Sequence, residues 1–407
     1  MVRWFANLIV AALWTGVMFG SEVAVGSPPA AQQAAARYEE AHFTVPSALI
    51  DNRVFVNVRL NGKGPFHFIL DTGASADMDE HVARQLGLKV EDAGEGQGVG
   101  QAKQRFGQTL VAKFQLGYLH LDDVPFIVTP FGDSSQVFGT EPVEGVIGRE
   151  VFERMVVTFD YVRRTLAFTE PDKFVYSRSG NVAQFERPRQ IPVIEGTLDG
   201  VPGKFGVDTG ARSALLLYGP FCLNNRLREK YGATLEGVTG WGFGGPVRSL
   251  LARAHEFKFG GTNVRDIVIR LSTQNAGLTT SSAVAGLIGP DVLSQFDVTF
   301  DYARSRIIFE KNRDYGRHDS YDRADLWMGQ SGKVFAAVDV IAGGPAYDAG
   351  VKIGDKILAI DSKSTELLVL PAVREKMRRL PAGDVVHLLL ETAGKQRAAA
   401  IKLRDLV

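Results

Sequence analysis

The sequence of 407 residues has a single cysteine, Cys222, so it cannot form a disulfide within the chain. Its seven histidines include no H-E-x-x-H motif and no neighbouring C-x-x-C, so no metal cage is recognisable. Net charge is also absent, because 46 basic side chains balance 46 acidic ones. Without an overall positive field, nucleic acid is not an expected partner. These absences argue against a metalloenzyme, a disulfide scaffold and a polyanion-binding protein, and the sequence predicts no cofactor.

The N-terminal 26 residues have the pattern of a secretory signal peptide. Arg3 precedes an apolar run from Trp4 to Phe19, and small residues follow up to Gly26. We therefore expect an exported protein, periplasmic or otherwise extracytoplasmic. The longer stretch from Trp4 to Val25 approaches the length that spans a bilayer, interrupted mainly by Glu22, so an N-terminal membrane anchor is the alternative.

The chain after residue 26 has an ordinary globular composition, 45% hydrophobic and 23% charged, with no second long apolar run. Residues 27–42, rich in Ala, Gln and Pro, have the composition of a linker. Alternating apolar residues then begin, for example Val54 to Leu60 and Phe66 to Leu70 on either side of an Asn-Gly turn. Similar short strands and glycine-rich turns continue to about residue 310, so we predict a mainly β protein.

An internal repeat sets the domain organisation. Residues 145–161 read GVIGREVFERMVVTFDY and residues 286–302 read GLIGPDVLSQFDVTFDY, 141 positions apart. Upstream, FILDTGA ending at Ala74 matches FGVDTGA ending at Ala211, 137 positions apart. The repeat predicts two homologous β lobes, residues 43–176 and 190–312, joined by a linker at 177–189.

Each predicted lobe presents one Asp-Thr-Gly turn directly after an apolar strand. Asp71 and Asp208 can therefore meet across the lobe interface, where two adjacent carboxyl groups share one proton. The ionised member can take a proton from a water molecule while the protonated member donates to a substrate carbonyl. We predict that Thr72 and Thr209 lock the two turns together through backbone hydrogen bonds.

These motifs resemble those of aspartic proteases, in particular the bacterial retropepsin-like group. Both copies carry D-T-G and a later apolar-apolar-Gly strand, and the resemblance covers residues 43–312. It implies a bilobal unit with Asp71 and Asp208 as the catalytic pair. It also implies hairpin flaps over the cleft, for which residues 94–107 and 237–245 are the candidates. The other site residues predicted are Gly73, Gly210 and Ser75 beside the dyad, and Gly98, Gly100, Trp241 and Gly242 in the flaps, with Trp241 at a flap tip.

The sequence departs from the family pattern beside both aspartates. Ala74 and Ala211 remove a hydroxyl that many pepsin-like enzymes place there, and losing a donor to a carboxylate raises its pKa. We therefore expect activity at mildly acidic to neutral pH. Ser75 in the first copy is replaced by Arg212 in the second, and an arginine there lowers the pKa of the dyad if it points inward or lies on the surface if it points outward.

A third unit, residues 324–407, follows a charged connector at 313–323 and resembles an α+β PDZ domain. The resemblance rests on G-G-P-A at 343–346 and A-G-V-K-I-G-D-K-I at 349–357. It implies binding of C-terminal peptide tails beside the helix expected near residues 371–380. The predicted carboxylate-binding loop is Leu326, Trp327, Met328 and Gly329. A basic cluster on the helix, Arg374, Lys376, Arg378 and Arg379, is expected to be a solvated face.

The sequence thus predicts an exported aspartic endopeptidase that hydrolyses polypeptide substrates through the Asp71/Asp208 dyad. Its PDZ domain would recruit substrate tails or regulate access to the cleft. The alternative is a catalytically silent peptide-binding or scaffolding protein with a protease-like fold, for which Arg212 beside the dyad is the main support.

Overall fold

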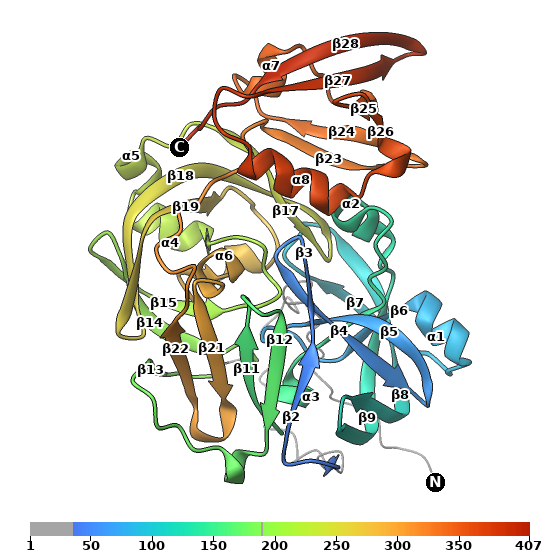
Figure 1. Cartoon of the computed structure of the whole chain (residues 1–407), viewed down its shortest axis with the longest axis vertical. Coiled ribbons are helices and arrows are strands. Elements are labelled where there is room, and N and C mark those ends of the chain that lie inside the picture. Colours follow the sequence, from blue (N-terminus) through green and yellow to red (C-terminus); the bar gives the residue numbers. More distant parts are fainter. Residues whose placement is uncertain (1–35, 189) are drawn as a thin grey trace.

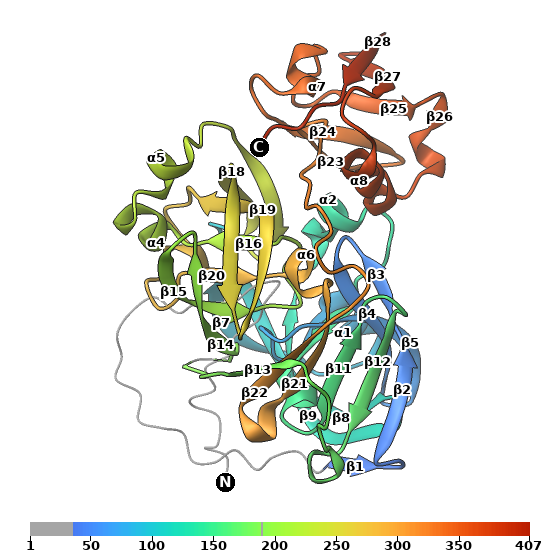
Figure 2. The same cartoon turned by 60° about the vertical axis from the view of Figure 1, so that its left-hand side comes forward.

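The computed structural model describes residues 36–188 and 190–407, and the signal peptide predicted at residues 1–26 lies outside them. Strands make up 49% of the chain and helices 16%, so the prediction of a mainly β protein is confirmed. Two β lobes lie side by side, the first blue to teal and the second green to yellow, with the C-terminal unit above them (Figure 1 and Figure 2). Within the described residues no helix is long and apolar enough to cross a membrane.

The first lobe is built on a nine-stranded sheet in the order β1-β9-β6-β10-β5-β4-β8-β7, with β3 beside β4. Its elements are β1 (Ala36–Tyr38), β3 (Ala48–Ile50), β4 (Arg53–Leu60), β5 (Lys63–Leu70), β6 (Asp77–Asp79), α1 (Glu80–Leu86), β7 (Glu91–Gln97), β8 (Lys103–Leu116), β9 (Leu119–Thr129), α2 (Ser135–Phe138), β10 (Gly145–Ile147) and α3 (Arg149–Phe152). Hydrophobic residues alternate along β4 and place Val54, Val56 and Val58 in the core.

The second lobe repeats this arrangement in a seven-stranded sheet, β14-β15-β20-β16-β19-β18-β17. Its elements are β14 (Val193–Leu198), β15 (Val201–Val207), β16 (Leu215–Leu217), α4 (Gly219–Asn224), α5 (Leu227–Tyr231), β17 (Glu236–Gly242), β18 (Gly245–Phe259), β19 (Thr262–Ser272), β20 (Gly286–Ile288) and α6 (Pro290–Leu293). In both lobes the strand before Asp-Thr-Gly pairs in parallel with the strand of the later glycine motif, β5 with β10 and β15 with β20. The sequence repeat is therefore a repeat of strand order.

A six-stranded sheet joins the lobes in the order β13-β22-β21-β11-β12-β2. Its strands are β2 (His42–Pro46), β11 (Val156–Asp160), β12 (Thr165–Thr169), β13 (Asn181–Gln184), β21 (Phe296–Asp301) and β22 (Arg306–Lys311). At its centre β11 pairs antiparallel with β21, and Thr158 lies opposite Thr299, its counterpart in the repeat, with 2.8 Å between their hydroxyl oxygens. This pairing places the local two-fold relation of the lobes at the middle of the sheet.

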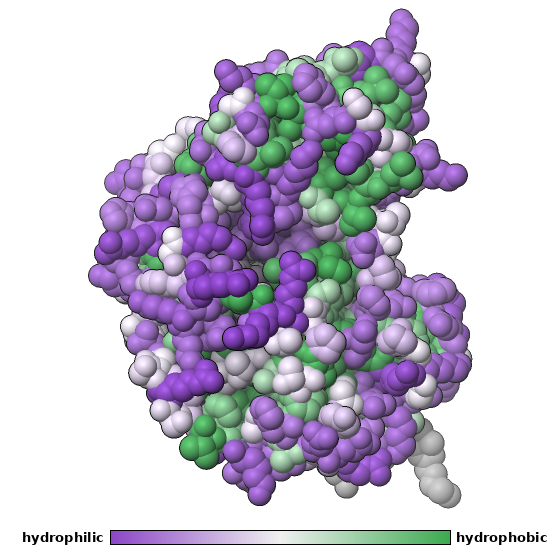
Figure 3. All heavy atoms as spheres, viewed as in Figure 1, coloured by the Kyte–Doolittle hydropathy of each residue, from purple (hydrophilic) through white to green (hydrophobic). Residues whose placement is uncertain are grey.

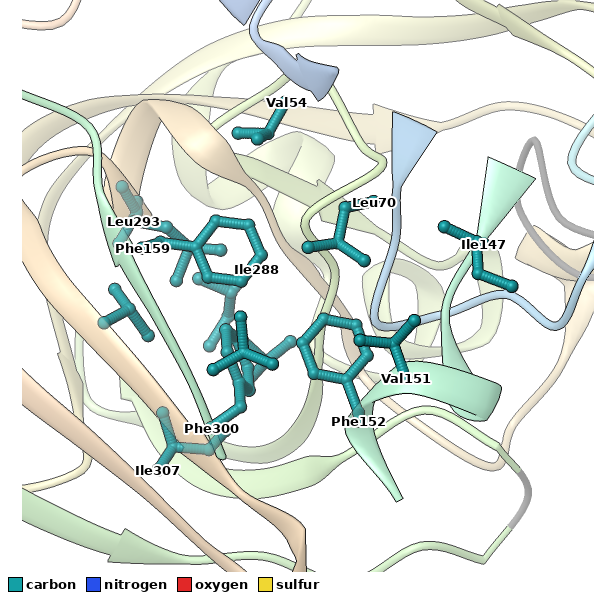
Figure 4. Close-up of a cluster of buried hydrophobic side chains, with 14 of the residues drawn as sticks. Val54, Leu70, Ile147, Val151, Phe152, Phe159, Ile288, Leu293, Phe300 and Ile307 are labelled. Atoms are coloured by element: carbon teal, nitrogen blue, oxygen red, sulfur yellow. The ribbon is translucent and has the colours of Figure 1, made fainter. Parts of the chain in front are cut away.

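Buried aliphatic and aromatic side chains from both lobes form one core beneath the two Asp-Thr-Gly turns (Figure 4). Phe152 and Phe159 of the first lobe contact Phe300 of the second, with ring centroids 5.5 and 5.6 Å apart. Leu70 and Ile288, which end the strands that carry and support the turns, lie in the same cluster. The shared core fixes the two lobes relative to each other at the level of the aspartates.

The C-terminal unit has the sheet order β23-β24-β25-β27-β28, with β26 beside β25. Its elements are β23 (Leu326–Ser331), β24 (Val334–Val340), α7 (Pro345–Asp348), β25 (Lys356–Ile360), β26 (Lys363–Ser364), α8 (Leu370–Arg379), β27 (Val385–Thr392) and β28 (Lys395–Lys402). This unit has its own hydrophobic core, separate from that of the lobes. Most of its surface in Figure 3 is hydrophilic, and hydrophobic side chains gather beside a notch between this unit and the first lobe.

Two segments predicted as linkers contain strands. Within residues 27–42, β1 pairs with β9, and the Tyr38 hydroxyl donates to Arg154 O at 3.2 Å. Within residues 177–189, β13 pairs with β22 and extends the interlobe sheet. A polar composition concealed both strands, because edge strands take their stability from the neighbour they pair with.

Candidate active site

The two Asp-Thr-Gly turns are fixed by equivalent backbone hydrogen bonds. The Asp71 N–H donates to Ile147 O at 2.9 Å, and the Asp208 N–H donates to Ile288 O at the same distance. Both acceptors end the short parallel strands β10 and β20. The later glycine motif of each lobe therefore positions the aspartate of the same lobe.

Gly148 and Gly289 close these motifs because no side chain fits behind the turns. A Cβ atom added at Gly148 would lie 2.0 Å from Asp71 O and 2.3 Å from Ala74 O. At Gly289 it would lie 2.2 Å from Ser213 O. Close backbone approach thus explains the final glycine in both copies of the repeat.

The threonines of the two turns contact each other reciprocally across the lobe interface. Thr72 Oγ1 donates to Val207 O at 2.7 Å and accepts from the Thr209 N–H at 3.1 Å. Thr209 Oγ1 donates to Leu70 O at 2.9 Å and accepts from the Thr72 N–H at 3.0 Å. Both threonines are buried, and these bonds satisfy both hydroxyls. The turns are therefore tied to each other as well as to their own lobes.

The structure brings the Asp71 and Asp208 side chains close enough for their charges to interact, and they are 2% and 0% exposed. Asp71 Oδ1 also accepts the Gly73 N–H at 2.7 Å. Asp208 Oδ1 accepts the N–H groups of Gly210 at 2.8 Å and Ala211 at 2.9 Å. A Cβ atom at Gly210 would lie 2.0 Å from Asp71 Oδ2, so glycine permits the two turns to meet. Ser75, the remaining predicted support residue, is buried near this turn.

The surroundings make the two carboxyl groups unequal. Burial raises the pKa of Asp71 well above its ordinary value, and the negative charge of Asp208 raises it further. Burial also raises the pKa of Asp208, but the N–H groups of Ala211 and Gly210 counteract this by stabilising its ionised form. Because Asp208 accepts two backbone N–H groups and Asp71 only one, the surroundings favour the proton on Asp71 and the negative charge on Asp208.

A buried arginine that the sequence analysis missed lies beside the dyad. Arg53, 3% exposed, donates from Nε to Gly210 O at 2.8 Å and pairs with Asp51 at 2.7 Å. Its charge lowers the pKa of both Asp71 and Asp208. An arginine directly before the apolar run Val54-Phe55-Val56 was the available signal, because a buried charge needs a partner.

Arg212 neither points at the two aspartates nor lies on the surface, the two positions that were considered from the sequence. Its guanidinium binds both oxygens of Asp51, each at 3.0 Å, and stacks over the Trp327 ring at 5.2 Å. Its side chain is 18% exposed. It is thus a largely buried link between the second lobe, the first lobe and the C-terminal unit.

The two predicted flap stretches form hairpins, β7-β8 and β17-β18, whose tips meet. The Gly100 N–H donates to Phe243 O and the Ala102 N–H donates to Gly244 O, both at 3.0 Å. Trp241 is not at a tip. It is partly buried and pairs with Pro246 in the ladder, two residues before the turn begins. The tip is Phe243-Gly244 because the bulge in β17 shifts the register. Of the other predicted flap residues, Gly98 and Gly100 lie in the first hairpin turn and Gly242 closes the second ladder.

Each hairpin tip packs against the opposite lobe. Val99 of the first hairpin lies in a buried cluster with Leu216 and Leu287 of the second lobe. Phe243 of the second hairpin lies in a cluster with Phe55 and other residues of the first lobe. A cavity of about 820 Å³ is found elsewhere, along the β14-β15 and β18-β19 hairpins, and no dyad residue lines it. Both aspartates are therefore buried beneath hairpins that pack against the opposite lobes.

The predicted carboxylate-binding residues Leu326 to Gly329 form strand β23 instead of a loop. β23 is an edge strand, and helix α2 of the first lobe contacts both that strand and α8. Gln136 O of α2 accepts the Trp327 Nε1–H at 3.2 Å, and a Cβ atom at Gly329 would lie 2.0 Å from Gln136 Oε1. The edge where a PDZ ligand would add a strand is therefore covered by the chain itself.

The basic cluster on α8 is only partly a solvated face. Arg374 is 4% exposed and donates to Val137 O, Gln136 O and Met328 O. Arg378 pairs with Asp291 of the second lobe at 2.6 Å. The prediction is wrong for these two residues because both are buried against the lobes, whereas the side chains of Lys376 and Arg379 are 47% and 71% exposed.

No group of His, Cys, Asp and Glu side chains within residues 36–188 and 190–407 could hold a metal ion. The titratable groups that the two turns bring together are the two coupled carboxyl groups of Asp71 and Asp208. Such a pair offers a base and an acid at adjacent positions.

Comparison with known proteins gives two family matches. Residues 56–151 match the aspartyl protease family, and residues 337–392 match the PDZ domain family. Among solved structures, the aspartic proteinase from Irpex lacteus is similar with a TM-score of 0.43 and 12% identity, covering 67% of this chain and 98% of that one. No curated protein matches the sequence. The two family matches confirm the resemblance predicted from the sequence, to aspartyl proteases in the first lobe and to PDZ domains in the C-terminal unit.

Proposed function

We propose that the protein is an aspartic endopeptidase. The observation that carries the proposal is the buried pair of Asp71 and Asp208, whose turns are held together by reciprocal threonine contacts and whose surroundings differ. Polypeptides are the proposed substrates, because two hairpins that meet between the lobes suit an extended chain.

The asymmetry of the pair assigns a role to each carboxyl group. Ionised Asp208 takes a proton from a water molecule whose oxygen attacks the scissile carbonyl carbon, while Asp71 donates its proton to the carbonyl oxygen. The resulting diol collapses when the C–N bond breaks. The proton held by Asp208 then passes to the leaving nitrogen, and a diol hydroxyl returns a proton to Asp71. The dyad ends in its starting state without a covalent intermediate.

The pH dependence of hydrolysis tests this assignment. We expect a bell-shaped kcat/KM profile with its maximum at mildly acidic to neutral pH, measured on a peptide library by mass spectrometry. Activity should fall on the acid side as Asp208 is protonated and on the alkaline side as Asp71 loses its proton. Because burial raises both pKa values, both limbs of the profile should lie at a higher pH than the pKa range of free carboxyl groups. A strongly acidic optimum, or peptide binding without turnover, would contradict the proposal.

For the PDZ domain we propose regulation of the cleft rather than open capture of tails. The domain contacts both lobes, since Arg374 binds carbonyl groups of α2 in the first lobe and Asp339 accepts the Val238 N–H of the second hairpin at 2.6 Å. Phe138 of α2 lies under the Arg53 guanidinium, at 5.2 Å, and Arg53 holds the Asp208 turn through Gly210 O. A peptide that displaced α2 from the groove would thus release contacts leading to the hairpin and the dyad.

Hydrogen exchange tests the proposed role of α2 as a latch that covers the PDZ groove until a peptide displaces it. Arg374→Met removes three hydrogen bonds from a charged donor, each of about 1.5 kcal/mol or more, so amide exchange in residues 136–139 should accelerate at least about tenfold. Arg379→Met, on the same helix but 71% exposed, should leave it unchanged. In the unmodified chain, saturating C-terminal peptides should accelerate exchange at residues 136–139 and at Val238. If bound peptide leaves both regions protected, the latch is wrong.

We also propose export, supported by Arg3 and the apolar run from Trp4 to Phe19. Fractionation of cells that express the full chain, with mass determination of its N-terminus, distinguishes a cleaved signal from a retained anchor. Protein found only in the cytoplasm would contradict export.

A further inference from the structure

A small enclosed cavity lies where the second lobe, the connector and the PDZ domain meet. Its volume is about 20 Å³, enough for one species about the size of a water molecule. The walls carry four arginines and one carboxyl group: Arg212, Arg270, Arg374, Arg378 and Asp322. A space this small and this rich in guanidinium groups selects for negative charge.

Arg270, in β19, is the residue that most requires a ligand. It is 6% exposed, and its Nε and Nη1 atoms have no hydrogen-bond acceptor in the described part of the chain. No ion pair of Arg270 occurs there either, and the Tyr321 ring, 5.8 Å away, supplies only a weak cation–π contact. Burial lowers the pKa of Arg270 to about 10, so it stays charged at neutral pH. A buried charge with unsatisfied donors is strongly destabilising unless an anion accompanies it.

The carboxyl groups nearby are committed to other arginines. Asp51 forms ion pairs with three guanidinium groups, 2.7 Å from Arg53, 3.0 Å from Arg212 and 3.7 Å from Arg374. No carboxylate remains there for Arg270.

Three further acids near Arg270 do not accept hydrogen bonds from it either. Asp291 pairs with Arg378 at 2.6 Å. Asp319 Oδ2 accepts the Val268 N–H and Asp322 Oδ1 accepts the Ala324 N–H, both at 2.9 Å. The negative charges of Asp291 and Asp319 act on Arg270, but its Nε–H and Nη1–H groups still lack an acceptor among the described side chains.

We propose that this cavity binds one monovalent halide ion, chloride in the cell, on the Nε–H and Nη1–H groups of Arg270. The size of the cavity excludes phosphate, sulfate and a peptide carboxylate. Arg212 and Arg374 both contact the Trp327 ring, 5.2 and 4.5 Å from its centroid, so the ion would lie beside the contact that joins the second lobe to the PDZ domain. Chloride would then stabilise the docked position of the PDZ domain, whether or not the protein hydrolyses peptides.

Thermal unfolding of the full chain in sodium chloride and in sodium gluconate at equal ionic strength tests the site. We expect a saturable, chloride-specific rise in Tm of a few degrees, as for any ligand that binds only the folded state. Arg270→Met should abolish the chloride-specific part. The matched control is Arg265→Met, on the same strand but with a side chain 64% exposed and paired with Glu256, and it should keep the full chloride effect.

Crystals soaked in sodium bromide provide a measurement that does not depend on a variant. A bromine anomalous peak within hydrogen-bond distance of Arg270 Nε and Nη1 is the expected result. A water molecule in the cavity without such a peak, together with equal Tm values in the two salts, would overturn the proposal. A chloride effect that persists unchanged in a folded Arg270→Met variant would also overturn it.

Discussion

Replacing either Asp71 or Asp208 with Asn is expected to reduce kcat/KM for peptide hydrolysis by about 10³-fold or more while leaving the fold intact. Each carboxyl group does work that an amide cannot, since Asn neither accepts the proton of water nor donates an acidic proton to a carbonyl. The fold should survive because Asn retains an oxygen for the N–H groups that Asp208 Oδ1 accepts. For Asp208→Asn, thermal unfolding at pH 7 should give an equal or higher Tm, because the buried charge of the pair is removed, whereas Asp71→Asn replaces a neutral group and should leave Tm nearly unchanged.

Asp77→Asn is the matched control for the dyad variants. Asp77 is also fully buried, lies six residues after Asp71, and has a pKa raised well above its ordinary value by burial. Its carboxylate accepts the Thr129 hydroxyl, at 3.0 Å to each oxygen, and it is not part of the dyad. This variant should hydrolyse the same peptides at close to the unmodified rate. Equal activity in all three variants would show that the dyad is not the catalyst.

The parts of the site that could be predicted from the sequence depend on short, local sequence patterns. An apolar strand followed by Asp-Thr-Gly specifies a strand and a tight turn, and the later glycine motif marks a close backbone approach. Duplication added the long-range information, because two copies of one lobe pack about a two-fold relation that brings equivalent positions together. Thr158 facing Thr299 in the interlobe sheet shows this directly.

The charged network behind the site was not predictable because each link joins distant segments. Arg53, Arg212 and Arg374 come from the first lobe, the second lobe and the PDZ domain, yet all three approach Asp51. No spacing rule connects them. An arginine on a short helix is most often solvated, so Arg374 was assigned to the surface, although packing against α2 buries it.

The helix that covers the PDZ groove could not be predicted for the same reason, because it comes from a distant segment of the chain. The groove-lining helix follows from the pattern of the C-terminal unit alone, whereas the start of strand β23 was predicted as a loop. Their occupant, the short helix α2 near residue 136, belongs to the first lobe, and nothing in its four residues marks it as a ligand. Recognition between two elements of one chain depends on shape, which a sequence pattern does not encode.

Gly210→Ala is expected to have the second largest effect on activity, through geometry rather than through loss of a proton donor. The added methyl group would lie 2.0 Å from Asp71 Oδ2 and 2.3 Å from Asp71 Cγ, so the two carboxyl groups must separate. A displacement of about 1 Å at reacting groups costs on the order of 100-fold in rate, and overpacking costs about 1–3 kcal/mol of stability. Steady-state kinetics and thermal unfolding measure both effects.

The pH profile distinguishes this geometric effect from general damage to the protein. The charge of Asp208 helps to raise the pKa of Asp71, so separating the two groups should move the alkaline limb of the profile toward lower pH. Gly132→Ala is the control, because its added Cβ atom would meet no heavy atom within 4 Å and its backbone is not left-handed. That control should keep both the rate and the profile. A Gly210→Ala enzyme that loses rate without any shift of the alkaline limb would mean that the carboxyl groups are not coupled in the active form.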